Sequence, residues 1–549
     1  MGPARARSPL LAVLVLYSFT GSDAFCAPPF QPRLGRLRSV RADQCRPGMP
    51  GGGRRAVALL AQGELTETAA GDTEENVVGD GDTNEVEPVI QPEIKDKGGV
   101  AAQRLAFPEL GTRQVDRLFS NLEPCDIMGF KRKPTSLLGA TALVGGTTVG
   151  AGILALPAAT IKAGLLPSSV ALIMMWMYMA ATGLLIAEVN VNVICRQGTP
   201  GVGLLALAER ALGTGGARFT GLVYVFIHYA LLVAYMAQGG ELLAEGLGAA
   251  LSLGPGQGLP EWVGPSLFCA AVGGLVVLGS EELVEGFNNA LVGILLVTFG
   301  ALLATGTGGV HPQYLLQQDW GAAGAAIPVM YVACVFHNVV PVVTTQLEGD
   351  VGKIRTAVVV GSAVPLLMFL AWNAVILGTV PAEAAAQAAG AGQTFDPLEV
   401  LRQGAAAGGT GDRLGLLVSL FSEVAIITSF NGFVVGLLDF FTDVFNVPLG
   451  DKGREAPLYG LILGPPLAVA CTDPGIFFSA LDSAGTFGIS LLCGVLPAAM
   501  AFAQRYREQE PVATLPLVPG GQVTLSAIAG FAFVVIGQKV VEMASTMYS

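Results

Sequence analysis

The 549-residue sequence contains few charged residues, and this scarcity decides its class. Charged residues make up 13% of the chain, whereas soluble globular domains carry about 25%. Hydrophobic residues reach 52%, and they gather in repeated runs of about 20, the length that crosses about 30 Å of hydrocarbon. This composition excludes a disordered chain, a coiled coil and an ordinary cytosolic enzyme. It indicates a polytopic membrane protein whose helices lie in a lipid bilayer.

The sequence also lacks the motifs of several functional classes. Its eight cysteines form no CxxC pair, which argues against a disulfide framework and against a zinc site. It has no HExxH, GxSxG or P-loop pattern, so we expect neither an enzyme, nor an ATP-driven pump, nor a bound cofactor. The net charge of −12 without a basic stripe argues against nucleic acid as a partner. No obligate protein partner is evident from the sequence.

The first 24 residues are predicted to be a signal peptide. Arg5 and Arg7 form a basic start, and residues 10–17 form a short apolar stretch. Residues 22–24 offer small side chains at the positions that a signal peptidase prefers, and the apolar stretch is short for a transmembrane helix. We therefore interpret this segment as a targeting sequence and exclude it from the fold.

Residues 25–62 are predicted to be a transit peptide, because they hold seven arginines and one acidic residue. The junction at 23–28 (DAFCAP) resembles the cleavage motif of algae with complex plastids, in which a transit peptide beginning with Phe follows a signal peptide. This resemblance implies a plastid envelope membrane. A secretory leader followed by a basic arm stays open, and with it another endomembrane or the plasma membrane.

Residues 63–133 are predicted to be an acidic, disordered tail. The stretch 63–98 carries eleven acidic residues and two lysines, with Gly and Thr between them. Such a stretch buries too little apolar surface to offset the entropy of ordering it. We interpret the tail as a spacer that precedes the membrane domain.

The remaining residues, 134–549, are predicted to form an all-α domain of eleven transmembrane helices. The predicted spans are 137–160, 167–190, 219–248, 264–280, 286–305, 324–347, 355–380, 413–440, 456–472, 477–502 and 522–542. Twelve Lys and Arg lie in the loops on the side of the N-terminal tail, called side one below, and three lie on the opposite side. Because positively charged loops stay inside, side one is predicted to face the cytoplasm or, in a plastid envelope, the stroma.

The first predicted span contains glycines that favour a break in the helix. Gly145, Gly146, Gly150 and Gly152 follow one another within eight residues, and each glycine costs about 1 kcal/mol relative to alanine in a helix interior. Small residues also allow membrane helices to pack closely, but these four point in several directions around a helix. We therefore expect an unwound segment here.

The sixth predicted span contains a second signal of this kind. Pro341 removes a helix hydrogen bond in mid-span, and His337, Asn338, Thr344 and Thr345 surround it. Polar groups at this depth must be satisfied internally or line a cavity. Two interrupted helices five spans apart are typical of secondary transporters, whose substrate site lies at the interface of two repeats. They fit a carrier better than a channel, which would need a pore-lining filter.

Three motifs in the same order resemble those of one transporter family. Residues 145–157 (GGTTVGAGILALP) resemble the first-helix signature of the hydroxy/aromatic amino acid permeases, the tryptophan/tyrosine permease group. Residues 336–341 (FHNVVP), followed by 349–355 (GDVGKIR), resemble the sixth helix of that family and the loop after it. Residues 428–432 (TSFNG) and 436–439 (GLLD) resemble its eighth helix.

The resemblance extends over about residues 135–545 and implies a LeuT-type five-plus-five inverted repeat followed by one helix. It also implies proton-coupled transport of aromatic or other neutral amino acids, by alternating access at broken helices 1 and 6. The aromatic preference rests on this resemblance alone. The residues that we expect to contact the substrate are Gly145, Gly146, Thr147, Thr148, Gly150, Gly152, Phe336, His337 and Asn338.

Four polar residues are candidates for coupling transport to an ion gradient. Glu188, near the side-one end of the second span, and His337 are candidates to carry a proton. Thr428 and Ser429 are adjacent hydroxyls in the eighth span, and in LeuT-type proteins such a pair can line a sodium site. The alternatives are an ion pair between Glu188 and an arginine of side one, and hydroxyls that bond to their own helix. Sodium coupling therefore stays open beside proton coupling.

Overall fold

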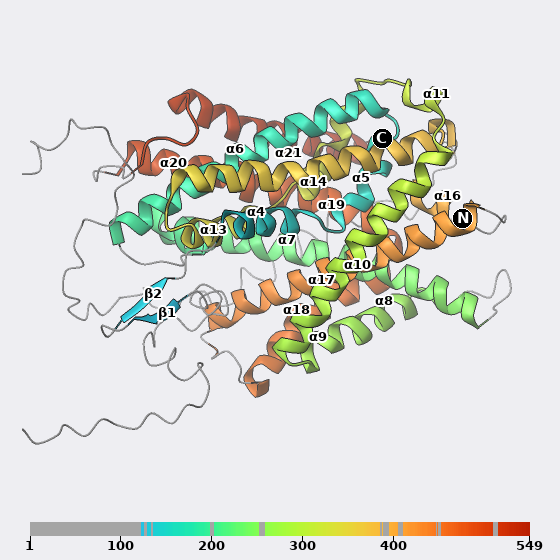
Figure 1. Ribbon diagram of the computed structural model, residues 1–549, viewed down its shortest axis with the longest axis horizontal. Helices are drawn as coiled ribbons and strands as arrows, with labels where there is room; N and C mark the ends of the chain where they lie inside the picture. Colours follow the sequence, from blue (N-terminus) through green and yellow to red (C-terminus); the bar gives the residue numbers. More distant parts are fainter. Residues whose placement is uncertain are drawn as a thin grey trace, which may run out of the picture. The chain divides into compact units, whose positions relative to one another are not determined.

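The computed structural model describes most of the predicted membrane domain and a short segment before it. The described residues are 122–125, 129–132 and 136–548, with gaps within 198–202, 252–258, 385–394, 405–409, 446–451 and 509–513. The predicted signal peptide, the predicted transit peptide and most of the predicted tail lie outside these residues. Figure 1 shows that the described domain is a bundle of helices, as expected for an all-helical polytopic membrane protein.

A small hairpin precedes the helices. Strands β1 (Leu122–Cys125) and β2 (Gly129–Arg132) are antiparallel, and Leu122 pairs with Arg132. Within the described residues, regular structure therefore begins at Leu122, before the boundary at 134 that the sequence suggests for the membrane domain.

Each predicted span corresponds to one or more helices. The helices of the first five spans are α4 (Leu137–Thr148), α5 (Gly152–Thr160), α6 (Leu165–Gln197), α7 (Leu204–Ala250), α8 (Val263–Phe268), the π-helix η3 (Cys269–Gly273), α9 (Gly274–Leu278) and α10 (Glu281–Gly306). After η4 (Thr307–Gly309) and α11 (Pro312–Leu315) come η5 (Ala322–Ala326), α12 (Ile327–Ala333), η6 (His337–Val339), α13 (Val340–Gln346) and α14 (Val351–Thr379). The last part holds α16 (Pro397–Gly404), α17 (Thr410–Phe445), α18 (Lys452–Thr472), η8 (Pro474–Ile476), α19 (Phe477–Ser483), the π-helix η9 (Ala484–Val495), α20 (Leu496–Tyr506) and α21 (Gly521–Tyr548).

Within the described residues, eight helices are long and apolar enough to cross a membrane, and the bent pair α4–α5 makes a ninth candidate. The predicted spans 264–280 and 456–472 correspond to shorter or less apolar helices. The first is the interrupted stretch Val263–Leu278, and the second is α18, which contains three prolines. The structure therefore supports a polytopic protein with eight or nine spans, while the count of eleven and the inverted repeat remain predictions.

Side-chain caps begin several of the helices. Ser136 accepts a hydrogen bond from Gly139 at the start of α4, and Ser280 accepts one from Leu283 at the start of α10. Asp350 does the same for α14, where its carboxylate accepts from the Lys353 amide at 3.1 Å. Such caps satisfy amides that have no partner within the first turn of a helix.

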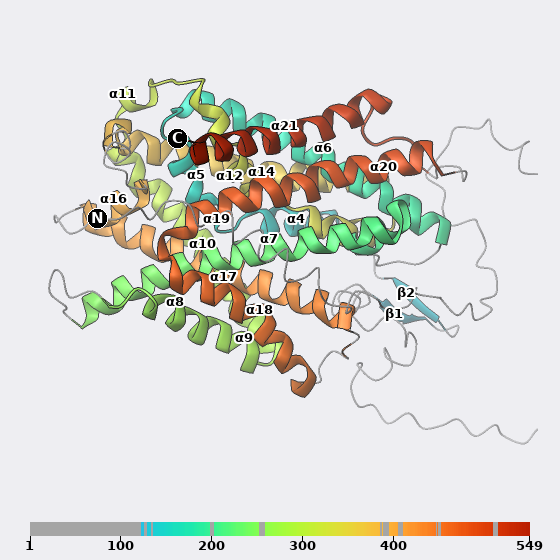
Figure 2. The same ribbon diagram turned by 180° about the vertical axis from the view of Figure 1, so that it is seen from behind.

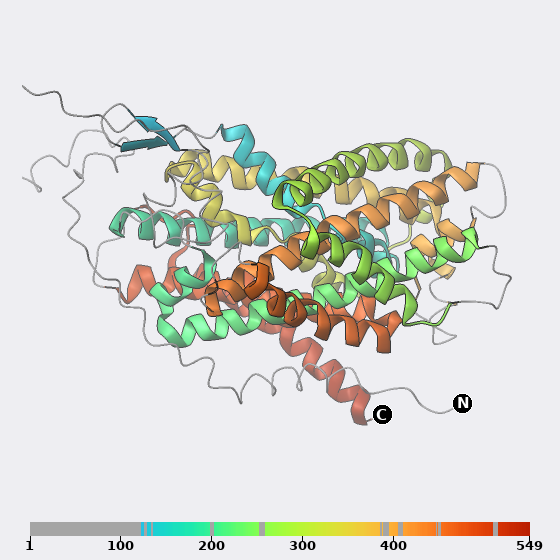
Figure 3. The same cartoon turned by 90° about the horizontal axis from the view of Figure 1, so that it is seen from below.

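The helices pack in two groups that are joined by α20. In the first group, α4, α6, α13 and α14 pack mainly on one another, and in the second group α8, α17 and α18 pack on α7. α20 lies against both α6 and α7, as the view from behind shows (Figure 2). α21 packs on η9 and α20 at the outside of the bundle (Figure 3), and only 22% of its apolar stretch is buried.

Candidate functional site

The first predicted span is divided into two helices. Between α4 and α5 the backbone of Val149 is extended (φ −79°, ψ 106°), and α5 begins at Gly152. The two helices are bent by 55° at this point. The predicted interruption is present, but it covers only 149–151, and Gly145 and Gly146 lie inside α4.

Two glycines of this span allow close packing with other helices. A Cβ atom on Gly145 would lie 3.0 Å from the carbonyl oxygen of Gly361 in α14. A Cβ atom on Gly152 would lie 2.9 Å from the Cα atom of Ala333, the last residue of α12. Gly145 therefore allows α4 to pack closely on α14 within the first group. Gly152 allows the break of the first span to contact the break of the sixth.

The sixth predicted span is also divided into two helices. α12 ends at Ala333, Phe336 has a non-helical backbone (φ −146°, ψ 7°), and the helix resumes as η6 and α13. Pro341 lies in the first turn of α13. A proline is well tolerated there, because the amide at that position needs no partner within the helix. Pro341 was expected to remove a helix hydrogen bond in mid-span, whereas it lies at the start of the second helix of the span.

The two breaks bring opposite helix ends together. The amino end of α5 lies against the carboxyl end of α12, where Gly152 and Ala333 meet. A helix carries partial positive charge at its amino end and partial negative charge at its carboxyl end. This arrangement can stabilise a carboxylate beside one helix end and an ammonium group beside the other, which are the two charged groups of an amino acid.

Ser429 of α17 reaches the break of the first span. The Ala151 amide donates to Ser429 Oγ at 2.9 Å, and a Cβ atom on Gly150 would lie 2.8 Å from this oxygen. The Tyr235 side chain of α7 lies close to Ser429 as well. The neighbouring Thr428 hydroxyl donates to carbonyls of its own helix at 3.0 Å. Of the predicted hydroxyl pair, Ser429 therefore lies at the break, and Thr428 bonds within α17.

His337 lies at the break of the sixth span and is buried. Its Nε2 atom lies 2.8 Å from the Thr182 hydroxyl of α6, and its Nδ1 atom has no hydrogen-bond partner among the described residues. The Phe336 ring packs beside it, with 4.9 Å between the two ring centroids. Phe336 is fully buried and would lie 2.7 Å from a Cβ atom on Gly183 of α6. The structure therefore places Phe336 in the packed core.

The remaining predicted contact residues differ in exposure. Gly146, Thr147 and Asn338 are exposed, while Thr148 is buried. The hydroxyls of Thr147 and Thr148 donate to carbonyls of their own helix. By contrast, nearly all of α5 and α12 is buried. In this conformation the breaks are covered on the α5 and α12 side, and exposed residues lie on the α4 and η6 side.

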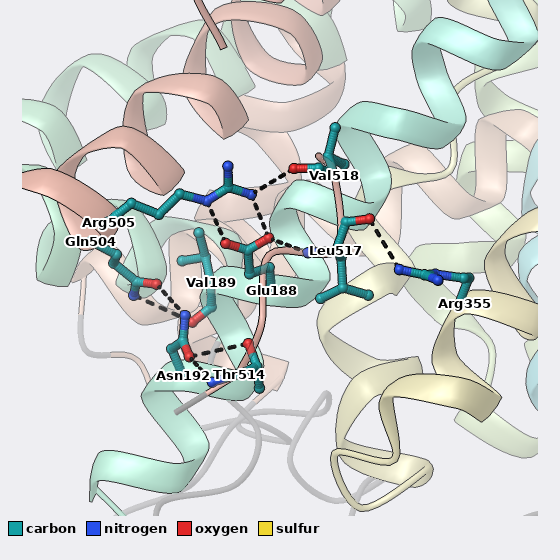
Figure 4. Close-up of polar contacts among 9 residues, drawn as sticks. All are labelled: Glu188, Val189, Asn192, Arg355, Gln504, Arg505, Thr514, Leu517 and Val518. Atoms are coloured by element: carbon teal, nitrogen blue, oxygen red, sulfur yellow. Dashed lines mark hydrogen bonds and ion pairs between the residues drawn. The ribbon is translucent and has the colours of Figure 1, made fainter. Parts of the chain in front are cut away.

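Glu188 lies apart from the breaks, near the end of α6. Its carboxylate accepts two hydrogen bonds from Arg505 of α20, each at 2.7 Å, and one from the Leu517 amide at 2.8 Å (Figure 4). Arg505 belongs to the arginines of side one, so this ion pair is the alternative that the sequence analysis left open. Sequence reasoning could not name the partner, because 317 residues separate the two side chains.

Two polar side chains of α6 beside the break of the sixth span, and one buried carboxyl group of α17, are not among the predicted site residues. Thr182 contacts His337 of η6, and the Asn190 side chain donates to the carbonyl of Pro341 in α13 at 3.1 Å. α6 therefore binds both η6 and α13, which follow the break of the sixth span. Both carboxyl oxygens of Glu423 in α17 are buried without a hydrogen-bond partner among the described residues. The available signal was the presence of polar residues within apolar spans.

Comparison with known proteins assigns the chain to a family. The family model for the "Tryptophan/tyrosine permease family" matches residues 133–539. The chain belongs to the tryptophan/tyrosine permease family. It is therefore an amino acid transporter rather than an enzyme, and an integral multi-pass membrane protein. This confirms the family resemblance that the three motifs indicate.

Curated proteins from bacteria align with this permease domain over most of their length. A tryptophan-specific transport protein of Pseudomonas aeruginosa is 29% identical over 388 residues, which cover 69% of this chain and 89% of the relative. The tyrosine-specific transport system 2 of Haemophilus influenzae is 29% identical, with 70% and 92% covered. The low affinity tryptophan permease of Escherichia coli is 24% identical, with 74% and 95% covered.

Proposed function

We propose that this permease carries aromatic amino acids by alternating access at the two helix breaks. The observation that supports this most is the contact of Gly152 with Ala333, which sets the positive end of α5 beside the negative end of α12. This pairing suits the carboxylate and ammonium groups that all amino acids share. The exposed residues Asn338 and Thr147 line the path to these two helix ends, together with the other residues at the breaks.

The aromatic preference is supported by the relatives. The tryptophan- and tyrosine-specific proteins and the low affinity tryptophan permease are 24–29% identical to this chain, but a glutamine transporter 2 of Aliivibrio fischeri is also 23% identical over 384 residues. Glutamine is therefore the natural competitor to test. We also infer eleven spans in a five-plus-five inverted repeat, since all eleven predicted segments are helical.

We infer that transport is coupled to protons, with His337 as the proton-carrying residue at the break. Its Nδ1 atom has no partner among the described residues, and the ring lies beside the backbone that a substrate would contact. Glu188 is the second candidate, but a proton there must displace an ion pair with Arg505.

Sodium coupling is the alternative that one observation favours. Ser429 Oγ lies at the break, where a cation could bind together with backbone carbonyls. However, this oxygen already accepts from the Ala151 amide, and Thr428 is engaged with its own helix. A sodium ion would therefore have to rearrange the break before it could use both hydroxyls.

Uptake into proteoliposomes tests these proposals. We expect labelled tryptophan and tyrosine to accumulate under an imposed proton gradient, and an excess of unlabelled tryptophan to compete better than glutamine or leucine. Accumulation that needs a sodium gradient, and that is lost in Ser429→Ala, would replace proton coupling by sodium coupling. Accumulation of glutamine alone would overturn the aromatic preference and leave the family assignment unchanged.

We also propose that the protein resides in the envelope of a complex plastid, with its N-terminal tail on the stromal side. The support is the arginine-rich segment 25–62 and the Phe25 junction that follows the predicted signal peptide. A fluorescent protein fused behind residues 1–62 should enter the plastid of a diatom or a similar alga. Secretion of this fusion would refute the transit peptide and retain the signal peptide alone.

A further inference from the structure

A short segment between α20 and α21 is tied to helices of the first group. We call residues 514–518 the strap. The Leu517 amide donates to the Glu188 carboxylate of α6 at 2.8 Å, and the Leu517 carbonyl accepts from the Arg355 guanidinium of α14 at 3.1 Å (Figure 4). The backbone amide and the backbone carbonyl of Leu517 are thus each bound by a side chain, and the two side chains come from different helices.

The Glu188–Arg505 ion pair links α20 to the carboxylate of α6 that also binds the strap. Arg505 binds both carboxylate oxygens, and it also donates to the Val518 carbonyl of the strap at 3.2 Å. The side chains of Arg505 and Glu188 are only 5% and 1% exposed. A paired, fork-like contact between arginine and a carboxylate fixes geometry as well as charge. Removing one partner of a buried pair leaves an uncompensated charge, so the pair resists separation.

A second layer of amide contacts lies one turn further along α6. The Asn192 side chain donates to Gln504 of α20 at 3.1 Å and accepts from the Thr514 amide at 3.2 Å. The Gln504 side chain in turn donates to the Val189 carbonyl at 3.3 Å. As Figure 4 shows, α6, α20 and the strap are therefore linked at two levels rather than by one contact.

The strap is bonded to helices of the first group and to α20. α6 and α14 belong to the first group, which contains the first half of the broken first span, and α20 also contacts α7 of the second group. Alternating access requires one set of helices to move against another around the substrate site. In the conformation described, α5 and α12 cover the breaks, whereas Thr147 and Asn338 are exposed on the other side.

We propose that the strap and the Glu188–Arg505 pair hold the transporter in the orientation in which the breaks are reached from the α4 side. Glu188 and Arg505 are then positioning residues that set the balance between the two orientations. This inference rests on the alternating access proposed above. Because these bonds tie α6 and α14 of the first group to α20, which also packs on α7, their loss should free the first group to move and shift the population toward the opposite orientation.

The test measures access to the break, independently of transport. Asn338→Cys is introduced in a variant whose native cysteines are replaced, and its labelling by a membrane-impermeant maleimide is followed from each side of oriented membrane vesicles. The paired substitution Glu188→Gln with Arg505→Gln removes both charges, retains the size of the Glu188 side chain and shortens that of Arg505. We expect labelling from the α4 side to slow by at least about fivefold, the lower end of typical coupling between sites, and labelling from the other side to accelerate.

Two further variants make the result specific. Arg505→Lys keeps the charge but loses the paired geometry, so it should give a smaller change in the same direction. Lys353→Gln removes an exposed ion pair with Asp350 on the same side, and it should leave labelling unchanged. Unchanged labelling in both Arg505 variants would overturn the role of the strap. Failure of alternating access itself would appear separately, as labelling of Asn338→Cys from one side only under every substrate and ion condition.

Discussion

Gly150 lies so close to Ser429 that a larger residue at position 150 should destabilise the protein. In Gly150→Ala the new methyl carbon would lie 2.8 Å from Ser429 Oγ, well inside the optimum of about 3.5–4.0 Å between non-bonded atoms. The hydroxyl cannot simply rotate away without losing its hydrogen bond from the Ala151 amide. We therefore expect a destabilisation of about 1–3 kcal/mol, the usual cost of overpacking.

Ser429→Ala removes the oxygen atom that causes the clash. In Ser429→Ala the nearest atom to the new methyl would be the Cβ atom of residue 429, at 4.0 Å. Ser429→Ala alone should cost about 1–3 kcal/mol, because the Ala151 amide loses its acceptor. Adding Gly150→Ala to it should then cost close to nothing, so the two substitutions should be strongly non-additive.

The assay is the thermal stability of the four proteins in detergent, with uptake measured in parallel. We expect a coupling free energy of at least about 1 kcal/mol, within the range found for residues in contact. An equal loss of stability from Gly150→Ala in both backgrounds would show that Ser429 does not limit the space at the break. Gly274→Ala is a matched control in a helix, because its Cβ atom would meet nothing within 4 Å.

Three more outcomes are expected. Gly150→Leu should reach the membrane and abolish uptake, since its side chain would fill the break; normal uptake would exclude this break from the site. Asp350→Ala should lower thermal stability by about 1 kcal/mol, while Asp350→Asn retains the cap. Because the Lys353 amide lowers the pKa of Asp350, the advantage of Asp350 over Ala should be present at neutral pH and fade as pH falls through its lowered pKa. His337→Gln should uncouple uptake from an imposed proton gradient, and unchanged gradient dependence would refute His337 as the proton carrier.

Several local predictions were correct because they rest on physics that acts over a few residues. The scarcity of charge and the apolar runs of about 20 residues identify membrane helices, since a helix satisfies its backbone polar groups within the segment that crosses the hydrocarbon. The glycines around 150 and the proline at 341 mark interruptions, and helix breaks occur near both. The order and spacing of the three motifs were sufficient to identify the family, and the family match over residues 133–539 confirms this identification.

Other predictions depended on contacts that no local pattern contains. Gly145 was expected in an unwound segment, yet it is helical and serves the close approach of α4 to Gly361 in α14. Pro341 was expected to remove a helix hydrogen bond in mid-span, yet it lies in the first turn of α13, where no such bond is lost. In each case the residue type is compatible with both outcomes, and the neighbouring helix decides between them.

The sequence by itself determined the membrane class, the family and the approximate positions of the two breaks, because hydrophobic length, glycine and proline act locally. Only the tertiary structure decided which side chains contact the helix breaks and which join helices elsewhere in the bundle. Ser429 reaches Ala151 across 278 residues, and Glu188 finds Arg505 across 317 residues. The physical reason is that a buried polar group must find a partner wherever packing provides one, and packing brings together helices that are distant in the chain.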